Sequence, residues 1–385
     1  MKWNNKGHQY DELGNNFANK KIVIYGAAAL GQELYEDIKF LGTVEAFVDR
    51  NKCIQETGCK GLPVISVGEL AKKKEDVIVV ISVPGYNGMM VHSQLMHLGF
   101  ELGKNCFYYD TFVNYYLSIY ALYACGLTYF PSISFLLTTT CNLNCKGCLN
   151  FTKQNKNRRH YGLDELKENA DAFFKHVDYV GKFHMSGGEP FHYPHYEELL
   201  EYIGSKYGKQ IKDFYTATNG TVIPRASLVN SLKKYDVFVE VDDYRQTLSS
   251  DVLKNDDVLD MLCRHGIRHS DRGAGYWINL DPENQNNSSL SEQDLGIWYD
   301  TCNNPFASVH NGRLYSCNYD DYAKEAGIVA DSDLDYLDLK ENDIDKKVLL
   351  EFRQGFTTRG YTNFCKRCAG HEMTNQKHIP VAEQY

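Results

Sequence analysis

The feature that most constrains the fold is an alternation of short apolar runs with amphipathic stretches between residues 131 and 280. The apolar runs read SISFLL, KFHMSGG, DFYTATNG, VFVEVDD, GIRHS and YWINL, and stretches such as GLDELKENADAFFKHV lie between them. Strands that alternate with helices of this length form parallel sheets, because each helix returns the chain to the start of the next strand. The pattern predicts an α/β fold, a partial (β/α)6 barrel with its site at the carboxyl ends of the strands.

An earlier part of the chain carries the same alternation in a shorter form. IVIY, VEAFVDR and VIVVISVP are separated by helix-like segments, which predicts a doubly wound parallel sheet. This layout resembles a small Rossmann-like domain, which we assign to residues 1–106. Its first turn reads GAAALG, with Ala28 where the dinucleotide fingerprint has a glycine, and Asp49 ends the second strand within range of a ribose hydroxyl. A nicotinamide site, a sugar-nucleotide site and a purely structural role all remain open.

Three further segments complete the predicted organisation. Residues 107–130 are rich in Tyr and Phe and predict an aromatic linker helix. The partial barrel is assigned to residues 131–290, and its polar end, DPENQNNSSLSEQD, is typical of a surface linker. A small module over residues 291–385 holds four cysteines, and we expect its polar tail to be poorly ordered.

Composition excludes several classes of partner. The formal net charge is −9 and no long basic tract is present, so we expect neither nucleic acid nor an anionic membrane as a partner. No uninterrupted apolar run reaches the length of a membrane span, and the first residues lack the apolar core of a signal peptide. Twelve cysteines without an export signal indicate a reducing compartment, which predicts a cytoplasmic protein whose clustered cysteines bind metal.

Three of these cysteines form one loop directly after the run SISFLL. Cys141, Cys145 and Cys148 are spaced as C-x-x-x-C-x-x-C. Soft thiolate ligands select iron–sulfur clusters or zinc. Because a closed site takes four protein ligands, three thiolates leave one coordination position open for chemistry. A zinc site with three thiolates remains the alternative.

The ends of the neighbouring strands make this loop more specific. The second run ends in SGGEP, the third in TNG, and the fourth carries two acidic residues in VEVDDY. Together with the cysteine loop, these motifs resemble the radical S-adenosylmethionine (radical SAM) enzymes over about residues 131 to 280. The resemblance implies a [4Fe–4S] cluster on Cys141, Cys145 and Cys148, whose free iron chelates S-adenosylmethionine. In that family an electron from the cluster cleaves the cofactor, and the resulting 5′-deoxyadenosyl radical removes a hydrogen atom from the substrate.

The resemblance also implies which residues contact the cofactor. They are Ser186, Gly187, Gly188, Glu189, Pro190, Asn219, Glu240 and Asp242. The glycines would offer backbone carbonyls to the methionine ammonium, Glu189 would help to orient it, and Glu240 or Asp242 would accept from the ribose hydroxyls. One position departs from the family: Gly147 stands where an aromatic residue usually precedes the third cysteine, and Leu149 or Phe151 would have to replace it.

A second group of cysteines lies in the last module. Cys302 and Cys317 flank a predicted β-hairpin whose turn is Asn311–Gly312, and Cys365 and Cys368 form a C-x-x-C pair. Four thiolates close a metal site, and a structural zinc ribbon is one alternative. The run GRLYSC resembles the auxiliary-cluster domains that follow radical SAM barrels, in the short form called twitch. That resemblance implies a second [4Fe–4S] cluster, hence two clusters per chain.

A redox reaction follows from these two clusters by resemblance. We expect hydrogen abstraction from a carbohydrate-type substrate (a sugar, aminocyclitol or nucleotide-linked sugar), oxidation of an alcohol with the auxiliary cluster as electron acceptor, and an electron donor such as flavodoxin or ferredoxin. Three alternatives remain: an epimerase of a sugar or peptide with Cys263 as hydrogen donor, a ribosomal-peptide maturase, and a non-catalytic iron–sulfur sensor or electron carrier. Candidate bases near strand ends are His184, His192, Tyr244 and Arg245.

Overall fold

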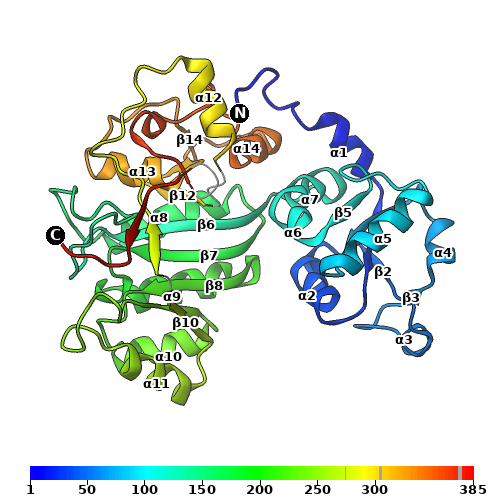
Figure 1. Ribbon diagram of the computed structural model, residues 1–385, viewed down its shortest axis with the longest axis horizontal. Coiled ribbons are helices and arrows are strands. Elements are labelled where there is room, and N and C mark those ends of the chain that lie inside the picture. The colour runs from blue at the N-terminus through cyan, green and yellow to red at the C-terminus, as the bar shows by residue number, and fades with distance from the viewer. Residues whose placement is uncertain (274, 303–305, 372–374) are drawn as a thin grey trace. The chain divides into compact units, whose positions relative to one another are not determined.

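The structure is a computed structural model, and it describes residues 1–273, 275–302, 306–371 and 375–385. Its contacts divide the chain into two units. One comprises Gly7–Pro131, and the other comprises Met1–Lys6 with Ser132–Tyr385 (Figure 1). Within the described ranges, no helix combines the length and the apolar character that a bilayer crossing needs.

The unit Gly7–Pro131 contains a parallel sheet, as its sequence pattern predicts. Its strands are β1 (Lys21–Tyr25), β2 (Val44–Val48), β3 (Val64–Ile65), β4 (Val77–Ile81) and β5 (Cys106–Tyr108), in the order β3-β2-β1-β4-β5. Its helices include α1 (Asp11–Phe17), α2 (Ala29–Ile38), α3 (Lys52–Thr57), α4 (Val67–Ala71), α5 (Gly85–His97) and α7 (Leu117–Cys125). The short β3 and β5 are missing from the sequence-based prediction, because two or three residues carry no periodic signal.

Helices cover both faces of this sheet. On one face, Val91 and Leu95 of α5 pack with strand residues such as Val79. On the other, Phe17 of α1 contacts Phe107, the neighbour of Cys106 in β5. Burial on both faces explains why β4 reads VIVVI without polar alternation. Because α7 packs against α1, the aromatic stretch 107–130 belongs to this unit rather than forming a separate linker.

The GAAALG turn is held by close packing of α2 at Gly31 and by hydrogen bonds to Asp49. A Cβ on Gly31 would lie 1.9 Å from the carbonyl oxygen of Gly26, so helix α2 approaches the strand end too closely for any side chain there. The Asp49 carboxylate accepts from the backbone N–H of Ala27 at 3.1 Å and of Asn51 at 2.9 Å. Asp49 therefore links the ends of β1 and β2 through one hydrogen bond to each of its carboxylate oxygens.

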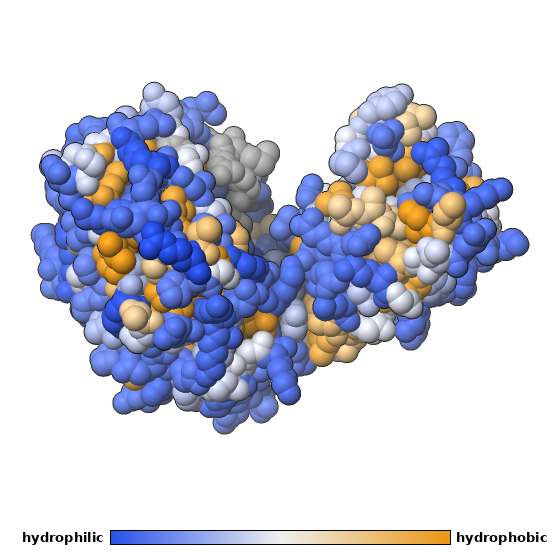
Figure 2. All heavy atoms as spheres, turned by 90° about the horizontal axis from the view of Figure 1, so that it is seen from below, coloured by the Kyte–Doolittle hydropathy of each residue, from blue (hydrophilic) through white to orange (hydrophobic). Residues whose placement is uncertain are grey.

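The helix surface of this unit is partly apolar. Figure 2 shows hydrophobic residues among hydrophilic ones on the visible face. The exposed large apolar side chains of α5 are Tyr86, Met89, Met90 and Met96.

The second unit is built on parallel strands joined by helices, which confirms the predicted α/β barrel architecture. The strands are β6 (Tyr129–Thr138), β7 (Tyr179–Gly187), β8 (Ile211–Thr218), β9 (Phe238–Asp243) and β10 (His269–Gly273). The helices between them are α8 (Leu163–Phe174), α9 (Tyr196–Tyr207), α10 (Ala226–Lys234) and α11 (Asn255–His265). The carboxyl ends of the strands meet at one edge of the sheet, where the cysteine loop begins (Figure 1).

The strand register separates an apolar face from a polar one. Phe183 pairs with Phe214, and Phe183 also packs on Phe135 and on Phe174 of α8, so this face is the helix-covered core. The alternate positions place His184 beside Tyr215 on the opposite face. Further along the sheet, the paired positions Ala217–Glu240 and Asp242–Arg272 continue that second face. Polar and charged side chains therefore gather on the face away from the helices.

The last module extends the same sheet. Strands β12 (Ala307–His310), β13 (Arg313–Tyr315) and β14 (Tyr336–Asp338) follow β6 in the order β10-β9-β8-β7-β6-β12-β13-β14, with β12 parallel to β6. The predicted hairpin is present: Asn311 and Gly312 both have positive φ, 52° and 71°, as a two-residue hairpin turn of this kind requires. The module's helices are α12 (Glu292–Asp300), α13 (Asn318–Glu325) and α14 (Lys346–Arg353).

Three sequence-based expectations for this region are wrong. YWINL is not a barrel strand, because β11 (Tyr276–Ile278) pairs antiparallel with β15 (His378–Pro380) in a separate ribbon. The polar tail is not poorly ordered over its described part, residues 375–385, because Val381 and Ala382 are fully buried. The segment 281–294 is not a simple surface linker, because Asn287 is buried within it. Alternation and polarity cannot reveal these contacts, since each depends on a partner far away in the sequence.

Candidate functional site: two cysteine clusters

The three-cysteine loop follows β6 and is largely enclosed. Cys145 is buried in an apolar cluster with Leu143 and Tyr244, and Cys141 and Cys148 pack against it. Burial, with a smaller contribution from the neighbouring thiols, raises the pKa of Cys141 and of Cys145 to about 12. Such thiols stay protonated unless a cation replaces the proton, and a bound metal does so. The loop thus has the donor set of a metal site.

Hydrogen-bond donors surround the sulfur atoms. The backbone N–H of Leu143 lies 3.4 Å from Cys141 Sγ, Asn219 Nδ2 lies 3.6 Å from the same sulfur, and Gln384 Nε2 lies 3.1 Å from Cys145 Sγ. Donors of this kind stabilise thiolate charge and tune the potential of iron–sulfur clusters.

The donor set of this loop is compatible with two kinds of metal site. In the part of the chain that the structure describes, no group of three or more His, Cys, Asp or Glu side chains converges on one metal position. Soft thiolate ligands suit an iron–sulfur cluster or a zinc ion, and three of them leave one coordination position open.

The end of β7 lies directly against the cysteine loop. Gly188 N donates to Thr138 O at 2.8 Å, and Glu189 N donates to Thr140 O at 3.0 Å. A Cβ on Gly188 would lie 2.4 Å from Thr140 O, so only glycine permits this approach. The Gly187 carbonyl, expected to receive a ligand ammonium, accepts from Asn150 Nδ2.

Glu189 joins the ends of two strands. Its carboxylate is fully buried and accepts from Phe191 N at 3.0 Å, Thr218 Oγ1 at 2.8 Å and Asn219 N at 2.8 Å. Burial raises its pKa to about 7, against the opposing effect of these donors. Three of the roughly four acceptor positions of a carboxylate are thus filled by protein groups. The contacts of Glu189 are those of a positioning residue. Pro190 begins the short 3₁₀ turn Pro190–His192 that follows.

The third strand end touches the cysteine loop as well. Asn219 Nδ2 donates to Asn142 Oδ1 at 3.1 Å, and Asn142 Nδ2 donates to Thr221 Oγ1 at 2.8 Å. Ser186, at the end of β7, is buried and hydrogen-bonds Tyr322 of α13. The structure therefore brings Asn219, Ser186 and the GGEP turn together around the loop, as the sequence suggests.

Glu240 and Asp242 lie on the polar face of β9 in different environments. Asp242 Oδ2 accepts from Tyr244 OH at 2.8 Å, and burial raises the pKa of Asp242 to about 6. Glu240 forms an ion pair with Arg272 at 2.7 Å. Burial raises the pKa of Tyr215, and a hydrogen bond to Glu240 adds to this effect. Asp242 is thus a carboxylate that exchanges its proton near neutral pH, while Glu240 is already paired.

The remaining candidate residues lie in three different settings. His184 is on the polar face beside Tyr215, with ring centroids 4.9 Å apart, and burial lowers its pKa to about 3. His192 is exposed. Arg245 forms surface ion pairs with Asp243, Asp256 and Asp271.

Cys263 is misplaced for its suggested role. It is exposed on α11, whose buried residues are Asn255, Val258 and Leu262. A thiol on the outside of a helix cannot deliver hydrogen to the polar face of the sheet. This exposed position argues against the sequence-based suggestion that Cys263 is a hydrogen donor.

The second cysteine group gathers residues from three segments. Cys302 follows α12, Cys317 precedes α13, and Cys365 and Cys368 lie on and after the 3₁₀ helix Asn363–Arg367. Burial raises the pKa of Cys365 to about 12 and that of Cys317 well above its usual value, and Cys302 acts electrostatically on both. Burial also raises the pKa of Cys368, and Cys365 and Cys302 add to this effect. Cys365 and Cys368 are buried and Cys302 and Cys317 are partly buried, and four thiols gathered in this way fit a closed metal site.

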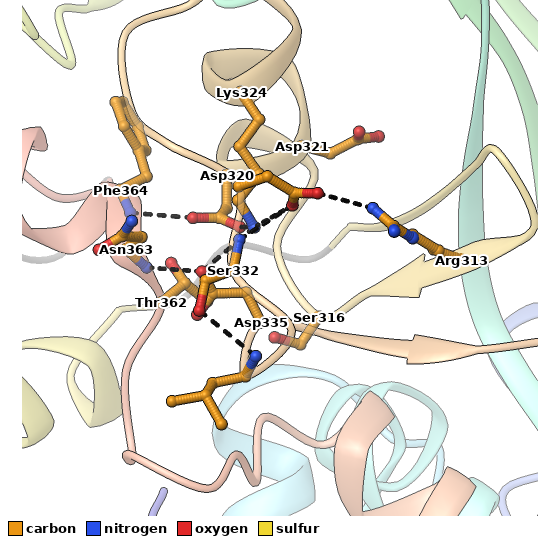
Figure 3. Close-up of polar contacts among 12 residues, drawn as sticks. Arg313, Ser316, Asp320, Asp321, Lys324, Ser332, Asp335, Thr362, Asn363 and Phe364 are labelled. Carbon is orange, nitrogen blue, oxygen red and sulfur yellow. Dashed lines mark hydrogen bonds and ion pairs between the residues drawn. The ribbon is translucent and has the colours of Figure 1, made fainter.

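A buried charge network supports this second group. Figure 3 shows Lys324 of α13 between two carboxylates: its Nζ lies 2.6 Å from Asp320 and 3.1 Å from Asp335, and both aspartates are fully buried. Arg359 also pairs with Asp335. Asp320 accepts from Phe364 N at 2.9 Å.

This network connects two of the ligand segments directly. Asp320 lies three residues after Cys317, and Phe364 immediately precedes Cys365. A second contact comes from Asn287, whose Nδ2 donates to the carbonyl oxygens of Cys365 at 2.8 Å and Cys368 at 3.0 Å. The sequence analysis missed both supports, because a polar residue in a loop carries no signal of its distant partner.

Comparison with known proteins gives a family match for the barrel. Residues 135–269 match the Radical SAM superfamily. Similar solved structures include anSMEcpe with bound AdoMet (TM-score 0.40, 15% identity, covering 61% of this chain and 84% of that one). BtrN in complex with AdoMet and 2-DOIA gives a TM-score of 0.41 at 17% identity, covering 66% of this chain and 97% of that one. SuiB from Streptococcus suis bound to S-adenosylmethionine gives 0.30 at 17%, covering 48% and 44%. No curated protein matches the sequence significantly.

Proposed function

We propose that the protein is an oxidoreductase that removes hydrogen from an alcohol carbon of a carbohydrate-type substrate. The proposal starts from the match of residues 135–269 to the Radical SAM superfamily. Members of this superfamily bind a [4Fe–4S] cluster and S-adenosylmethionine. When bound, this pair supplies a 5′-deoxyadenosyl radical that abstracts a hydrogen atom.

The observation that carries the proposal is the meeting of the open cysteine loop with two strand ends. Cys141 lies beside Asn219, and the loop contacts the GGEP turn through Thr138 and Thr140. In our proposal Cys141, Cys145 and Cys148 hold the cluster, and the backbone of Gly187 and Gly188 borders the cofactor. Glu189 holds β7 and β8 at the spacing that this arrangement needs.

The polar face of the sheet suits a substrate rich in hydroxyl groups. His184, Tyr215, Glu240 and Arg272 offer donors and acceptors on one surface beside the strand ends. We assign Asp242 as the group that accepts the hydroxyl proton, because its pKa of about 6 keeps it ionised at neutral pH while it remains basic enough to receive a proton. Glu240, held by Arg272, is then the better candidate for the cofactor ribose.

We assign the second cysteine group as an auxiliary [4Fe–4S] cluster that accepts the substrate electron. Four thiolates fill every iron corner, so this cluster would transfer electrons rather than bind substrate. A reduced flavodoxin or ferredoxin would supply the first electron. A structural zinc ion is the competing assignment, and metal analysis separates the two: about eight irons per chain support two clusters, whereas four irons and one zinc support zinc.

The alternatives have less support. An epimerase needs a thiol near the substrate, and Cys263 lies on the outer side of α11. Leader-peptide recognition in peptide maturases usually uses a small winged-helix domain, and the unit Gly7–Pro131 is instead a five-stranded parallel sheet in its described residues. A non-catalytic iron–sulfur protein has no need for the glycine-dependent turn at Gly188.

The test is anaerobic. Reconstituted protein is reduced with dithionite, mixed with S-adenosylmethionine and assayed for 5′-deoxyadenosine. Cys145→Ala should abolish the product, and Cys263→Ala should leave it unchanged. With candidate sugars and aminocyclitols in deuterated water, a ketone product without solvent deuterium supports oxidation. Deuterium at the product carbon would instead show epimerisation, and deoxyadenosine from Cys145→Ala would refute the assignment.

A further inference from the structure

We propose that residues 378–385, here called the strap, position the three-cysteine loop, and that Gln384 donates a hydrogen bond to the Cys145 sulfur of the bound cluster. This inference rests on the proposed function, because it concerns the cluster that Cys141, Cys145 and Cys148 would hold. Gln384 is a positioning residue in this account rather than a catalytic one.

The strap pairs with the loop through the backbone. Cys145 and Gln384 form an antiparallel bridge. Lys146 N donates to Glu383 O at 2.6 Å, and Tyr385 N donates to Asn144 O at 3.1 Å. Residues 144–146 thereby gain backbone hydrogen bonds of the kind found between antiparallel strands. These bonds fix the conformation of the loop before the metal binds.

The side-chain amide of Gln384 makes three hydrogen bonds. Its Oε1 accepts from Asn144 N at 2.8 Å, and its Nε2 donates to Cys145 Sγ at 3.1 Å and to Ala382 O at 2.6 Å. The partners define which atom is nitrogen, because a backbone N–H can only donate. An amide fixed by three contacts holds its N–H toward the sulfur, where it stabilises the added negative charge of the reduced cluster.

Apolar and ionic contacts anchor the strap on both sides of Gln384. Val381 and Ala382 are buried in the same apolar cluster as Leu143 and Cys145. Lys146 pairs with Glu383 at 2.6 Å, and Lys153 Nζ lies 3.2 Å from the ring centre of Tyr385.

The strap also accounts for the unusual glycine in the cysteine motif. Gly147 has φ +63°, and a Cβ there would lie 2.7 Å from Ile379 Cγ2. Ile379 belongs to β15 and therefore fills the space beside the position where an aromatic side chain usually stands. Gly147 and the strap are thus structurally linked, because the side chain of Ile379 lies where a side chain at position 147 would otherwise stand.

The experiment measures the midpoint potential of the cluster in the full-length, anaerobically reconstituted protein. The signal to follow is the electron paramagnetic resonance (EPR) spectrum that changes when S-adenosylmethionine is added, since this identifies the cluster on the three-cysteine loop. Wild type is compared with Gln384→Met, which has a similar length and no N–H, and with Gln384→Asn, which keeps an amide that is too short to reach Cys145. Gln376→Met is the matched control, because Gln376 is exposed and has no side-chain contact among those described.

We expect both Gln384 variants to disfavour the reduced cluster about tenfold, a shift of about 59 mV to more negative potential for a one-electron couple, and the control to match wild type. Equal potentials in wild type and in the Gln384 variants, with the cofactor-responsive signal intact, would overturn the inference alone. A wild-type protein with no cofactor-responsive signal would overturn the proposed function, and the inference with it. Gln384→Asn keeps the test valid if Gln384→Met does not fold.

Discussion

Replacing Lys324 with methionine tests how the auxiliary cysteine group is held. Lys324 is the cation between two fully buried aspartates, 2.6 Å from Asp320 and 3.1 Å from Asp335, and its own side chain is only 7% exposed. Methionine preserves most of the aliphatic packing but removes the charge. Asp335 keeps Arg359, whereas Asp320 keeps only the N–H of Phe364 among its described donors. Removing one partner of a buried ion pair costs about 3–5 kcal/mol.

The cost should depend on pH with a definite sign. Burial already raises the pKa of Asp320 to about 6, above its value in the unfolded chain, and loss of Lys324 raises that pKa further. A carboxyl group whose pKa is raised by folding stabilises the folded state while it is protonated, and this contribution is lost as pH rises through the folded pKa. Lys324→Met should therefore be destabilised less at pH 6 than at pH 8.

The assay is anaerobic urea unfolding of the reconstituted protein at pH 6, 7 and 8, with iron content measured in parallel. Lys346→Met is the matched control, because Lys346 pairs with Asp178 at the surface with 47% of its side chain exposed, and such pairs contribute about 0–1 kcal/mol. We expect Lys324→Met to lose auxiliary iron along with stability. A loss below about 1 kcal/mol, equal to that of the control and independent of pH, would refute the reasoning.

Three further predictions concern the two sites. Burial raises the pKa of Glu189 to about 7, so the stability of the metal-free wild type should fall as pH rises from about 4.5 to about 7, by up to about 3 kcal/mol. Glu189→Gln should remove this dependence in urea titrations, and an unchanged pH profile would contradict it. Gly188→Ala places a Cβ 2.4 Å from Thr140 O and should abolish deoxyadenosine formation. Gly68→Ala, with no atom nearer than 3.9 Å in helix α4, should be neutral or stabilising by about 0.5–1 kcal/mol in the same assays. Cys365→Ala should halve the iron content while cofactor cleavage continues, and full loss of cleavage would argue against separate roles for the clusters.

The parts of the fold that the sequence predicts are those with local signals. Strands such as β4, the Asn311–Gly312 turn and the cysteine loop are each recognisable within about ten residues, because periodicity, turn chemistry and ligand spacing are local properties. The strand ends that meet at the loop are also predictable, since parallel strands place their carboxyl ends at one edge.

The parts that the sequence does not predict depend on distant partners. Gln384 contacts Cys145 across 239 positions, and Asn287 reaches the C-x-x-C loop across about 80. Both residues lie in polar segments, and composition alone predicts that such segments are exposed to solvent. The parallel pairing of β12 with β6 is likewise invisible, because a four-residue strand pairs equally well with many edges.

The most direct test of the central claim is EPR spectroscopy of the anaerobically reconstituted and reduced protein, recorded before and after addition of S-adenosylmethionine. We predict a [4Fe–4S] signal whose shape changes when the cofactor is added, and which is lost in Cys141→Ala. A reduced protein with no such signal, or with a signal that is indifferent to the cofactor, would contradict the assignment of an open iron position on the three-cysteine loop.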